Sequence, residues 1–461
     1  MSASVEHPGH YGPLSSGRAG VVGAGIAGLA AAIALRRAGW DVEVFERSQF
    51  KNEIGAAITV TPNAAMVLRR WGFDMEKAMA MLNQSMILGL AADPSVILDQ
   101  QEYPDGDGVL KYGVWSFHRV DLHRGLRDLA TATANSVVSG RPVQIRLGCK
   151  IEGIDCEAGV LHVSGSRTIH KDLLLLADGA HSDLISKFTG YPCEARRNNK
   201  SIYRWLVPMD VILSEADIGQ FYHRERSGFV GWLDPDTQTL MVTYTCRGGK
   251  VLNVALVHDT QPGRAQEKEW HSQVSTEEVL ATATNFHPWL KKIVSMPTED
   301  GINVHHVVTR SPLNSFVRGR TVVVGDAAHV MMPSHAAGAG IAIESAASLE
   351  VLFRGVDGKD DPTVRHRLEL FDKLRVPRCN LTLLVSNSHM GRLQEPGVVD
   401  EIRKFYQGTL PTPGTLPYSK PWMNVLFNHD EFRAAEKLLT EESVEAEDQT
   451  ALAGGSLPDG Q

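Results

Sequence analysis

The sequence predicts an α/β fold with three parts: a parallel sheet with helices on both faces, an inserted and mainly antiparallel β domain, and a helical C-terminal part. Three patterns support this prediction. A short apolar strand, a glycine-rich turn, a helix and a second strand follow one another over residues 19–46. Repeated strand signals dominate residues 201–257, and helical periodicity extends over residues 362–390.

Length and composition limit the classes of protein that need to be considered. The chain has 461 residues, 43% of them hydrophobic, and a formal net charge of -8. That length predicts two or three domains, and the negative charge argues against a nucleic-acid binder. Residues 1–17 are polar, and the apolar run over residues 19–35 is broken by glycines and too short for a membrane span. We therefore expect a soluble, cytoplasmic protein.

Cysteine and histidine usage gives no sign of a metal site or a disulfide framework. The five cysteines are scattered and form no CxxC pair, which fits a reducing compartment. His305 and His306 are adjacent in a strand, so their side chains point to opposite faces. We expect no metal ion.

The pattern of elements divides the chain into six ranges. We predict a disordered N-terminus (1–18), the first part of a Rossmann-like domain (19–195), the β domain (196–300), the second part of the first domain (301–391), a C-terminal segment (392–440) and a disordered tail (441–461). Within them, Ser275 and Glu278 have the spacing of a capping box, so a helix is expected to start there. Pro288 is expected to end or kink that helix.

The turn between the first strand and the first helix has the spacing of a dinucleotide-binding site. Gly23 suits a tight turn, Gly25 lets a diphosphate approach the backbone, and Gly28 lets the helix pack closely on the strand. Glu46 ends the second strand, where a carboxylate accepts hydrogen bonds from a ribose. This motif alone does not distinguish FAD from NAD, nor from a glycine-rich turn without a ligand.

A second polar site is predicted where Asp326 follows the buried strand 321–324. Gly338 and Ala339 begin the next helix. A carboxylate at the end of a strand can bind a polyol hydroxyl, and a helix N-terminus stabilises negative charge on a bound ring. The other interpretation of Asp326 is a residue that only caps a helix.

These sites, in this order, closely resemble the group A flavoprotein monooxygenases of the salicylate hydroxylase and p-hydroxybenzoate hydroxylase type. The resemblance covers residues 18–190 and 303–390. It is nearest in character to fungal members that tailor secondary metabolites. It implies one noncovalently bound FAD, with Asp326 on the ribityl chain.

A third family motif matches residues 178–182, which begin with Asp178 and Gly179. In the family this motif lies between the flavin and the route of the nicotinamide coenzyme. The family commonly has arginine three residues after the last serine of the motif, whereas this chain has Ile185. How the coenzyme is held is therefore open, and Lys187 is one possible substitute.

Three further positions follow from the resemblance. Arg119 matches an arginine that contacts the flavin side of the cofactor in relatives; the other interpretation is a solvated residue at a helix start. Ala57 stands at a close-contact glycine in the loop beneath the isoalloxazine. Ala337 stands where many relatives carry glutamine, so side-chain contacts cannot be assumed there.

Two residues of the β domain are candidates for catalysis. Arg204 stands where several fungal dearomatising and indole-oxidising members carry an active-site arginine, and its guanidinium could hold a phenolate. Tyr244 lies in a strand that could face the same cavity. A salt-bridged surface arginine and an ordinary sheet tyrosine are the other interpretations.

By this resemblance, the chain uses FAD, O2 and NAD(P)H as co-substrate to hydroxylate, epoxidise or dearomatise a small aromatic or conjugated substrate through a flavin C4a-hydroperoxide. The sequence has no second dinucleotide fingerprint, so the nicotinamide coenzyme is expected to bind transiently against the flavin. We expect neither nucleic acid nor membrane as a partner, and a monomer or a homodimer.

Other reactions use the same scaffold. An FAD-dependent oxidase or dehydrogenase would carry a similar dinucleotide site. A halogenase-like enzyme is a further alternative, although the chain has no Trp-x-Trp-x-Ile-Pro element. An FAD-binding regulatory protein without catalysis also remains.

Overall fold

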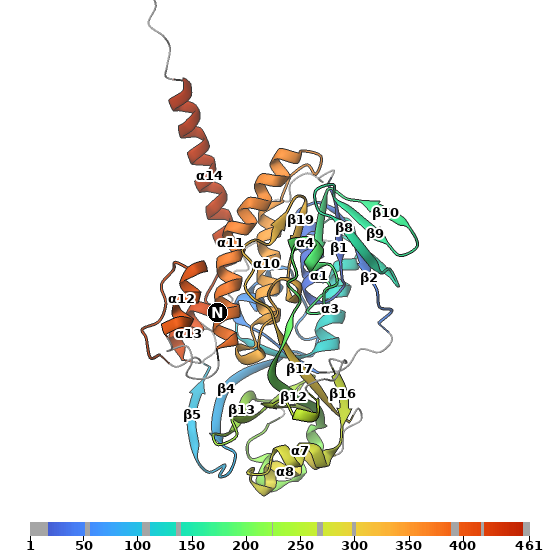
Figure 1. Ribbon diagram of the computed structural model, residues 1–461. Coiled ribbons are helices and arrows are strands. Elements are labelled where there is room, and N and C mark those ends of the chain that lie inside the picture. Colours follow the sequence, from blue (N-terminus) through green and yellow to red (C-terminus); the bar gives the residue numbers. More distant parts are fainter. Residues whose placement is uncertain are drawn as a thin grey trace, which may run out of the picture.

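The computed structural model describes residues 17–50, 56–103, 111–134, 140–223, 225–264, 271–296, 301–388, 396–415 and 419–454. Their strands form a six-stranded, a ten-stranded and a small three-stranded sheet. Figure 1 shows the two large sheets in different halves of the molecule, with most of the long helices around the six-stranded one. No helix within the described ranges combines the length and the apolar character that a membrane span needs.

The six-stranded sheet is the predicted doubly wound sheet. Its order is β18 (Val317–Arg318), β19 (Thr321–Val323), β11 (Leu173–Leu176), β1 (Arg18–Val22), β2 (Asp41–Glu46) and β7 (Gln144–Leu147). All neighbouring strands are parallel except β18 and β19. Helix α1 (Ile26–Arg37) joins β1 to β2 and packs between α10 (Gly338–Leu352) and α3 (Arg119–Thr131). The predicted return of the strand after residue 172 to this sheet is confirmed.

The ten-stranded sheet forms the second half. Its order is β16 (His271–Val274), β17 (Ile302–Thr309), β12 (Arg196–Pro208), β15 (Val251–Asp259), β14 (Thr239–Cys246), β13 (Ser227–Asp234), β4 (Met81–Leu90), β6 (Val114–His118) and β3 (Ala57–Val60), with β5 (Ile97–Glu102) paired to β4. The strands β12, β15, β14 and β13 pair antiparallel in that order, as predicted. The three-stranded sheet consists of β8 (Ile151–Asp155), β9 (Val160–Val163) and β10 (Arg167–His170).

The β domain draws on more of the chain than the predicted range 196–300. Residues 57–118 supply β3 to β6, and β17 comes after residue 300. Residues 57–118 join this sheet through the parallel pairing of β13 with β4, in which Gly231 lies opposite Leu88. Such a pairing between strands far apart in sequence leaves no local signal, which is why the sequence assigned these residues to the first domain.

Short helices cover one face of the ten-stranded sheet. They are α5 (Met209–Ser214), α6 (Ala216–Gly219), α7 (Thr276–Thr282) and α8 (Pro288–Ser295), and Figure 1 shows α7 and α8 beyond the sheet. The Ser275 hydroxyl accepts a hydrogen bond from the Glu278 N–H, which confirms the helix start. Pro288 does not end this helix, because α7 already stops at Thr282; the proline instead begins α8, where its missing N–H costs nothing.

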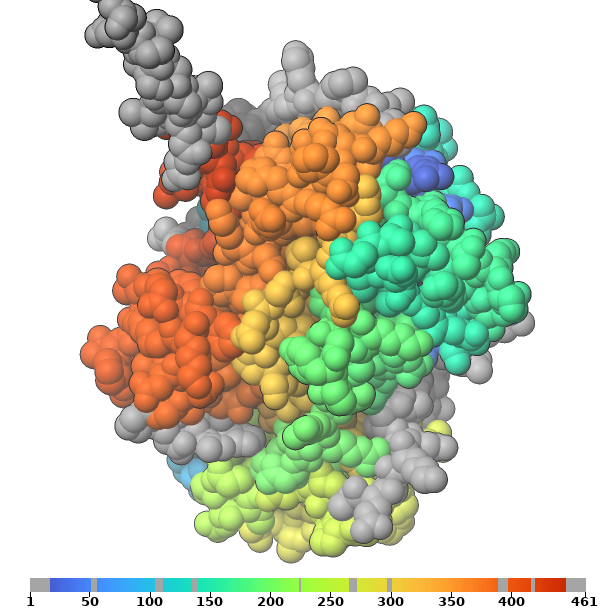
Figure 2. All heavy atoms as spheres, turned by 45° about the horizontal axis from the view of Figure 1, so that its top comes forward, coloured from blue at the N-terminus to red at the C-terminus, as the bar shows by residue number. Residues whose placement is uncertain are grey.

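Four helices follow α10 in the described part of the chain: α11 (Asp361–Asn387), α12 (Pro396–Phe405), α13 (Lys420–Phe427) and α14 (Glu431–Gly454). Figure 2 shows the C-terminal helices in orange-red beside the orange surface of α11. The structure continues α14 to Gly454, although a disordered tail was predicted from Glu441. Glutamate, lysine and alanine favour helix, and the pair Lys437–Glu441 adds an i,i+4 contact. Residues 1–16 and 455–461 lie outside the described residues.

A fully buried charge network ties the C-terminal helices to α10. Glu344 of α10 lies 2.8 Å from Arg375 and 3.0 Å from Arg378, both on α11, and Arg375 also pairs with Glu431 at the start of α14. Arg378 further donates to the backbone carbonyls of Val425 and Leu426 in α13. Burial raises the pKa of Glu344, but the two arginines outweigh it and hold that pKa well below its usual range.

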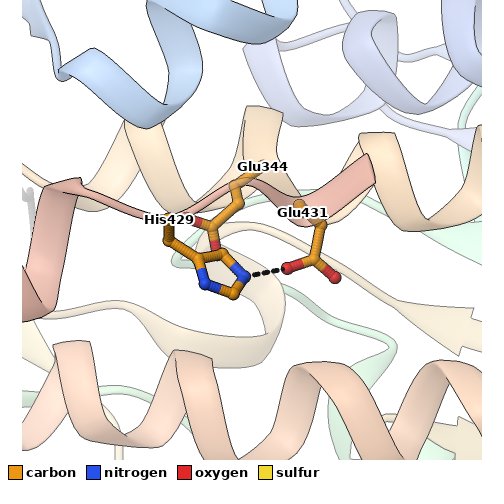
Figure 3. A group of neighbouring side chains, drawn as sticks. All are labelled: Glu344, His429 and Glu431. Atoms are coloured by element: carbon orange, nitrogen blue, oxygen red, sulfur yellow. Dashed lines mark hydrogen bonds and ion pairs between the residues drawn. The ribbon is translucent and has the colours of Figure 1, made fainter. Parts of the chain in front are cut away.

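The same network brings together three groups that could bind a metal ion. Figure 3 shows Glu344, His429 and Glu431 pointing toward one another, and their ligand atoms lie within 4.8 Å. His429 Nε2 lies 2.7 Å from Glu431 Oε2. Arginine guanidinium groups already contact both carboxylates, so their negative charges are balanced without a metal ion.

Arg375→Met is expected to lower the free energy of unfolding by about 3–5 kcal/mol, because it leaves Glu344 and Glu431 buried beside one fewer cation. Urea unfolding followed by circular dichroism would measure the change. The control is Lys373→Met on the same helix, whose exposed ion pair with Glu442 contributes little. Equal losses in the two variants would show that the network does not stabilise the fold.

Candidate active site

The glycine turn after β1 has the geometry that the sequence predicts. Gly23 has a φ of +99°, and a Cβ there would lie 2.4 Å from the Ala177 carbonyl oxygen. A Cβ at Gly28 would lie 2.0 Å from the Gly23 carbonyl oxygen. At Gly25, by contrast, a Cβ would meet no described atom within 4 Å. The turn is therefore closed on the sheet side and open where a diphosphate would approach the start of α1.

Glu46 holds the same turn from the end of β2. Its carboxylate accepts hydrogen bonds from the Ala24 N–H at 2.8 Å and the Ser48 N–H at 2.7 Å. From α3, His123 Nε2 lies 2.7 Å from the Ala24 carbonyl oxygen. A carboxylate has about four acceptor positions, so Glu46 can still accept from a ribose diol. Its contact with the ribose stays a prediction.

Asp326 begins α9 (Asp326–His329) at the end of β19, next to the glycine turn. Gly325 has a φ of +64°, and a Cβ there would lie 2.5 Å from the Ala27 Cβ. The Asp326 side chain is exposed, yet surrounding protein atoms raise its pKa, against the charges of Arg119 and Arg310. Both observations hold for a carboxylate that faces an opening in the fold. A polyol hydroxyl would find an acceptor there.

The segment from Gly325 to the start of α10, called the GD loop below (residues 325–337), carries the helix start that the sequence predicts. Helix α10 begins at Gly338, followed by Ala339, and among the described residues no side chain caps it. Its first N–H groups are therefore available to a ligand. Ala337 is buried and packs with Leu381 and Trp422, which accounts for an apolar residue at this position.

The DG loop (residues 178–182) follows β11 on the same sheet edge. Asp178 Oδ2 accepts a hydrogen bond from the Ser182 hydroxyl at 2.8 Å, whereas Asp178 Oδ1 is buried with no partner in the described part of the chain. Burial raises the pKa of Asp178. Ile185 is buried at the start of α4 (Ile185–Thr189), and Lys187 donates to the Glu152 carbonyl oxygen. Lys187 is therefore engaged outside the DG loop.

Arg119 and Ala57 meet at the junction between the two large sheets. The Arg119 N–H donates to the Ala56 carbonyl oxygen at 2.8 Å, and the Arg119 guanidinium is close enough to lower the pKa of Asp326. The Ala57 N–H donates to Asn253 Oδ1 at 3.3 Å, which links the predicted flavin loop to β15. Residue 55 of that loop lies outside the described residues.

The register of the ten-stranded sheet puts Arg204 and Tyr244 on one face. Arg204 lies opposite Ala255, and Ala255 lies opposite Val242. Tyr244 is two residues beyond Val242, so its side chain points to the same side. Asn253 lies opposite Tyr244 and shares this side, which is turned away from the helices α5 to α8. We call it the inner face.

The inner face turns toward the six-stranded sheet and the GD loop. Its half-buried side chains are Leu206, Phe229, Leu240, Val242 and Tyr244, together with Arg204. Met332 of the GD loop packs with Ile202 on the same strand as Arg204. The side chains of Arg204 and Tyr244 are therefore brought to the side of the sheet that carries the predicted flavin loop.

Arg204 and Tyr244 also interact electrostatically. Burial lowers the pKa of Arg204, and Tyr244 opposes this shift. Burial raises the pKa of Tyr244 to about 12, against the charge of Arg204. The buried Nε of Arg204 has no hydrogen-bond partner among the described residues. Arg204 is thus half-buried and not an exposed arginine, and the described groups that shift its pKa include no carboxylate.

Two residues of this region carried no family motif. Asn253 is the polar residue in an apolar strand, a weak signal that sequence reasoning passed over. Arg310 follows β17 and reaches the DG loop, donating to the Ala180 carbonyl oxygen at 3.4 Å. Its partner lies far away in sequence, so no local pattern points to it.

Comparison with known proteins fits this geometry. Residues 18–356 match the model of a family described as an FAD binding domain. The chain is 30% identical over 374 residues to the FAD-dependent monooxygenase cfoG of Aspergillus candidus, covering 80% of this chain and 84% of that protein. It is 27% identical over 399 residues to hispidin-3-hydroxylase of Neonothopanus nambi, covering 84% and 90% of the two chains.

A solved structure shares the fold. The structure of a salicylate hydroxylase substrate complex superposes with a TM-score of 0.68 at 21% sequence identity, covering 92% of this chain and 98% of that chain. This structure confirms the predicted α/β fold. The family model and the relatives confirm the resemblance to FAD-dependent monooxygenases. The chain belongs to the FAD-binding-domain family and is an FAD-dependent monooxygenase of group A, the aromatic-hydroxylase type.

Proposed function

We propose that this enzyme uses NAD(P)H and O2 to transfer one oxygen atom to a small aromatic or conjugated molecule that carries an acidic hydroxyl group. The observation that supports this substrate class is Arg204 on the inner face. Its Nε is a buried donor with no partner among the described residues, and it lies beside the neutral phenol of Tyr244. A relative named 3-hydroxybenzoate 6-hydroxylase, by that name a hydroxylase of a phenolic molecule, supports this substrate class.

A guanidinium in this position favours an anionic ligand. Arginine stays protonated in proteins, so Arg204 cannot lose its charge to reduce the cost of burial. A buried charge is usually paired, and the described groups that shift its pKa include no carboxylate. A phenolate or enolate would supply the missing acceptor in the planar geometry that a guanidinium prefers. Holding the substrate as an anion would also make its ring carbon a better nucleophile.

The neighbours of Arg204 suit an aromatic ring. Phe229 and Tyr244 are in contact, with ring centroids 5.1 Å apart and planes at 64°. Leu206 and Val242 add apolar surface on the same face. Because the pKa of Tyr244 is about 12, its hydroxyl stays protonated at neutral pH and can donate a hydrogen bond to the substrate. The side chains would align a ring and exclude water.

FAD supplies the redox chemistry and the activation of O2 when it is bound. We assign its adenosine end to the glycine turn, with Gly23, Gly25 and Gly28 around the diphosphate and Glu46 on the ribose. Asp326 would accept from the ribityl hydroxyls, and the start of α10 at Gly338 and Ala339 would stabilise negative charge on the reduced ring. Ala57 and Arg119 lie on the side of the β domain. Asp178, the first residue of the DG loop, would lie between the flavin and the route of the nicotinamide coenzyme.

Asp326→Asn is expected to weaken FAD binding by about 1.5–3 kcal/mol, the usual contribution of a hydrogen bond to a charged group, or about 10- to 150-fold in Kd. Fluorescence of FAD released on dilution of the holoenzyme would measure it. The matched control is Asp361→Asn, which also removes the charge of an aspartate at a helix start, that of α11. Equal FAD release by both variants would mean that Asp326 only caps its helix.

Arg204→Met is expected to keep a normal flavin spectrum and lose oxygenation. A preorganised donor to a developing charge typically contributes ~10²–10³ in turnover. Arg204→Lys should restore little, because lysine lacks the planar fork. The measurement is oxygenated product formed per NAD(P)H oxidised, at equal flavin occupancy. The control is Arg226→Met, an exposed arginine just before β13 that pairs with Glu102.

Two results would contradict the proposal in different ways. If Arg204→Met matches the wild type in rate and in product ratio, the substrate does not contact Arg204. If the wild-type enzyme returns all O2 as H2O2 with every phenolic compound tested, the protein acts as an oxidase.

A further inference from the structure

We propose that Arg310 is a positioning residue that joins the DG loop to the GD loop and supplies the cation that position 185 does not carry. This inference concerns FAD binding and is independent of the proposed substrate. Arg310 directly follows β17 and its side chain is buried. In Figure 2 the yellow-orange surface near residues 310–330 lies between the green surface of residues near 180–200 and the orange-red C-terminal helices.

Arg310 is bonded to both loops at once. Its Nη2 donates to the Ala180 carbonyl oxygen in the DG loop at 3.4 Å, and its Nη1 donates to the Cys193 carbonyl oxygen. Its backbone N–H donates to the Val330 carbonyl oxygen in the GD loop at 3.0 Å. The side chain and the main chain of one residue therefore fix the separation of the two loops.

The DG loop cannot receive a cation from position 185. Ile185 is fully buried in the apolar core, where a guanidinium would have to leave water without a carboxylate partner. The Ser182 hydroxyl accepts a hydrogen bond from the Ile185 N–H at 3.0 Å, so the backbone there is already used. Arg310 reaches the same loop from another strand. Arg310 thus brings a positive charge to the DG loop from a position far from residue 185 in the sequence.

Arg310 and the DG loop each hold a polar atom that could bind a ligand. Arg310 Nε and Asp178 Oδ1 are both buried without a partner in the described part of the chain. Burial lowers the pKa of Arg310, and the charge of Asp178 opposes this shift. Arg310 in turn acts to lower the pKa of Asp326, while Arg47 acts to lower that of Asp178. Unpaired buried polar atoms are costly, and a polar ligand between the loops would relieve that cost.

The consequence for FAD is a dependence on pH. The groups that face Asp326 are Arg119 from α3, His329 from α9 and Arg310, with Glu344 of α10 acting on His329. Burial lowers the pKa of His329 to about 4, so its ring stays neutral above pH 5.5. Surrounding protein atoms raise the pKa of Asp326, and removing the charge of Arg310 would raise it further. Without the charge of Arg310, Asp326 would take up a proton at a higher pH than in the wild type. A protonated carboxyl is the weaker acceptor, so FAD would be released earlier when the enzyme is acidified.

The test compares Arg310→Gln, which removes the charge but keeps an N–H donor, with Arg310→Lys, which keeps the charge. FAD release from each holoenzyme is followed by fluorescence between pH 5.5 and 8.5. We expect the midpoint of FAD loss in Arg310→Gln to lie about one pH unit above the wild type, equivalent to about a tenfold change in binding. Arg310→Lys should keep the wild-type midpoint.

A double-mutant cycle and a matched control separate positioning from simple stabilisation. In the Asp326→Asn background, Arg310→Gln should cost clearly less FAD affinity than it does alone, because the charge it acts on is gone. Arg318→Met is the control: Arg318 also donates to two carbonyl groups of α4, of Lys187 and Phe188, but it is exposed. It should leave the midpoint unchanged.

Three results would overturn the proposal. One is a loss of FAD that is equal at every pH and additive with Asp326→Asn. Another is a midpoint that moves as far in Arg318→Met as in Arg310→Gln. If Arg310→Gln does not fold, Arg310→Lys decides: a midpoint shifted upward despite the retained charge would show that the charge is not what Arg310 contributes.

Discussion

The candidate site depends on a row of backbone hydrogen bonds across the ends of four parallel strands. The Gly23 N–H donates to the Phe45 carbonyl oxygen, the Ala177 N–H to that of Val22, and the Val324 N–H to that of Leu176, at 2.8, 2.8 and 2.9 Å. These bonds set the ends of β2, β1, β11 and β19 side by side. Each strand then leads into one polar loop, so residues 23, 46, 178 and 326 share one edge of the sheet.

A second constraint brings the β domain to that edge. The Ala57 N–H bonds to Asn253, and Met332 packs against Ile202, so both the strand pair at β3 and the GD loop contact the inner face. Since side chains alternate along a strand, the register decides whether Arg204 points toward this edge or into the helix-covered core, which takes Tyr203 and Trp205 instead. A shift of one residue would exchange these roles.

The parts of the fold that sequence reasoning could predict are those with a local cause. The glycine turn, the strand ending at Glu46 and the helix start at Gly338 each depend on neighbouring residues, and the structure has them at the predicted positions. The membership of β3 to β6 in the second sheet, the engagement of Asn253 and the reach of Arg310 depend on partners more than a hundred residues away. Local periodicity cannot report such contacts. At Pro288 the local sequence is ambiguous, because a proline can either follow the end of one helix or begin the next helix.

The buried network around Glu344 bears on how the chain is made. Its two arginines lie on α11 and its second carboxylate, Glu431, begins α14. During synthesis the ribosome releases Arg375 before Glu431, and at about 5–20 residues per second the 56 residues between them take roughly 3–11 s. Over that interval Arg375 can face Glu344 but lacks Glu431, its second partner. Helix α10 also packs against α14, so part of its apolar surface stays uncovered and available to chaperones until α14 has been made.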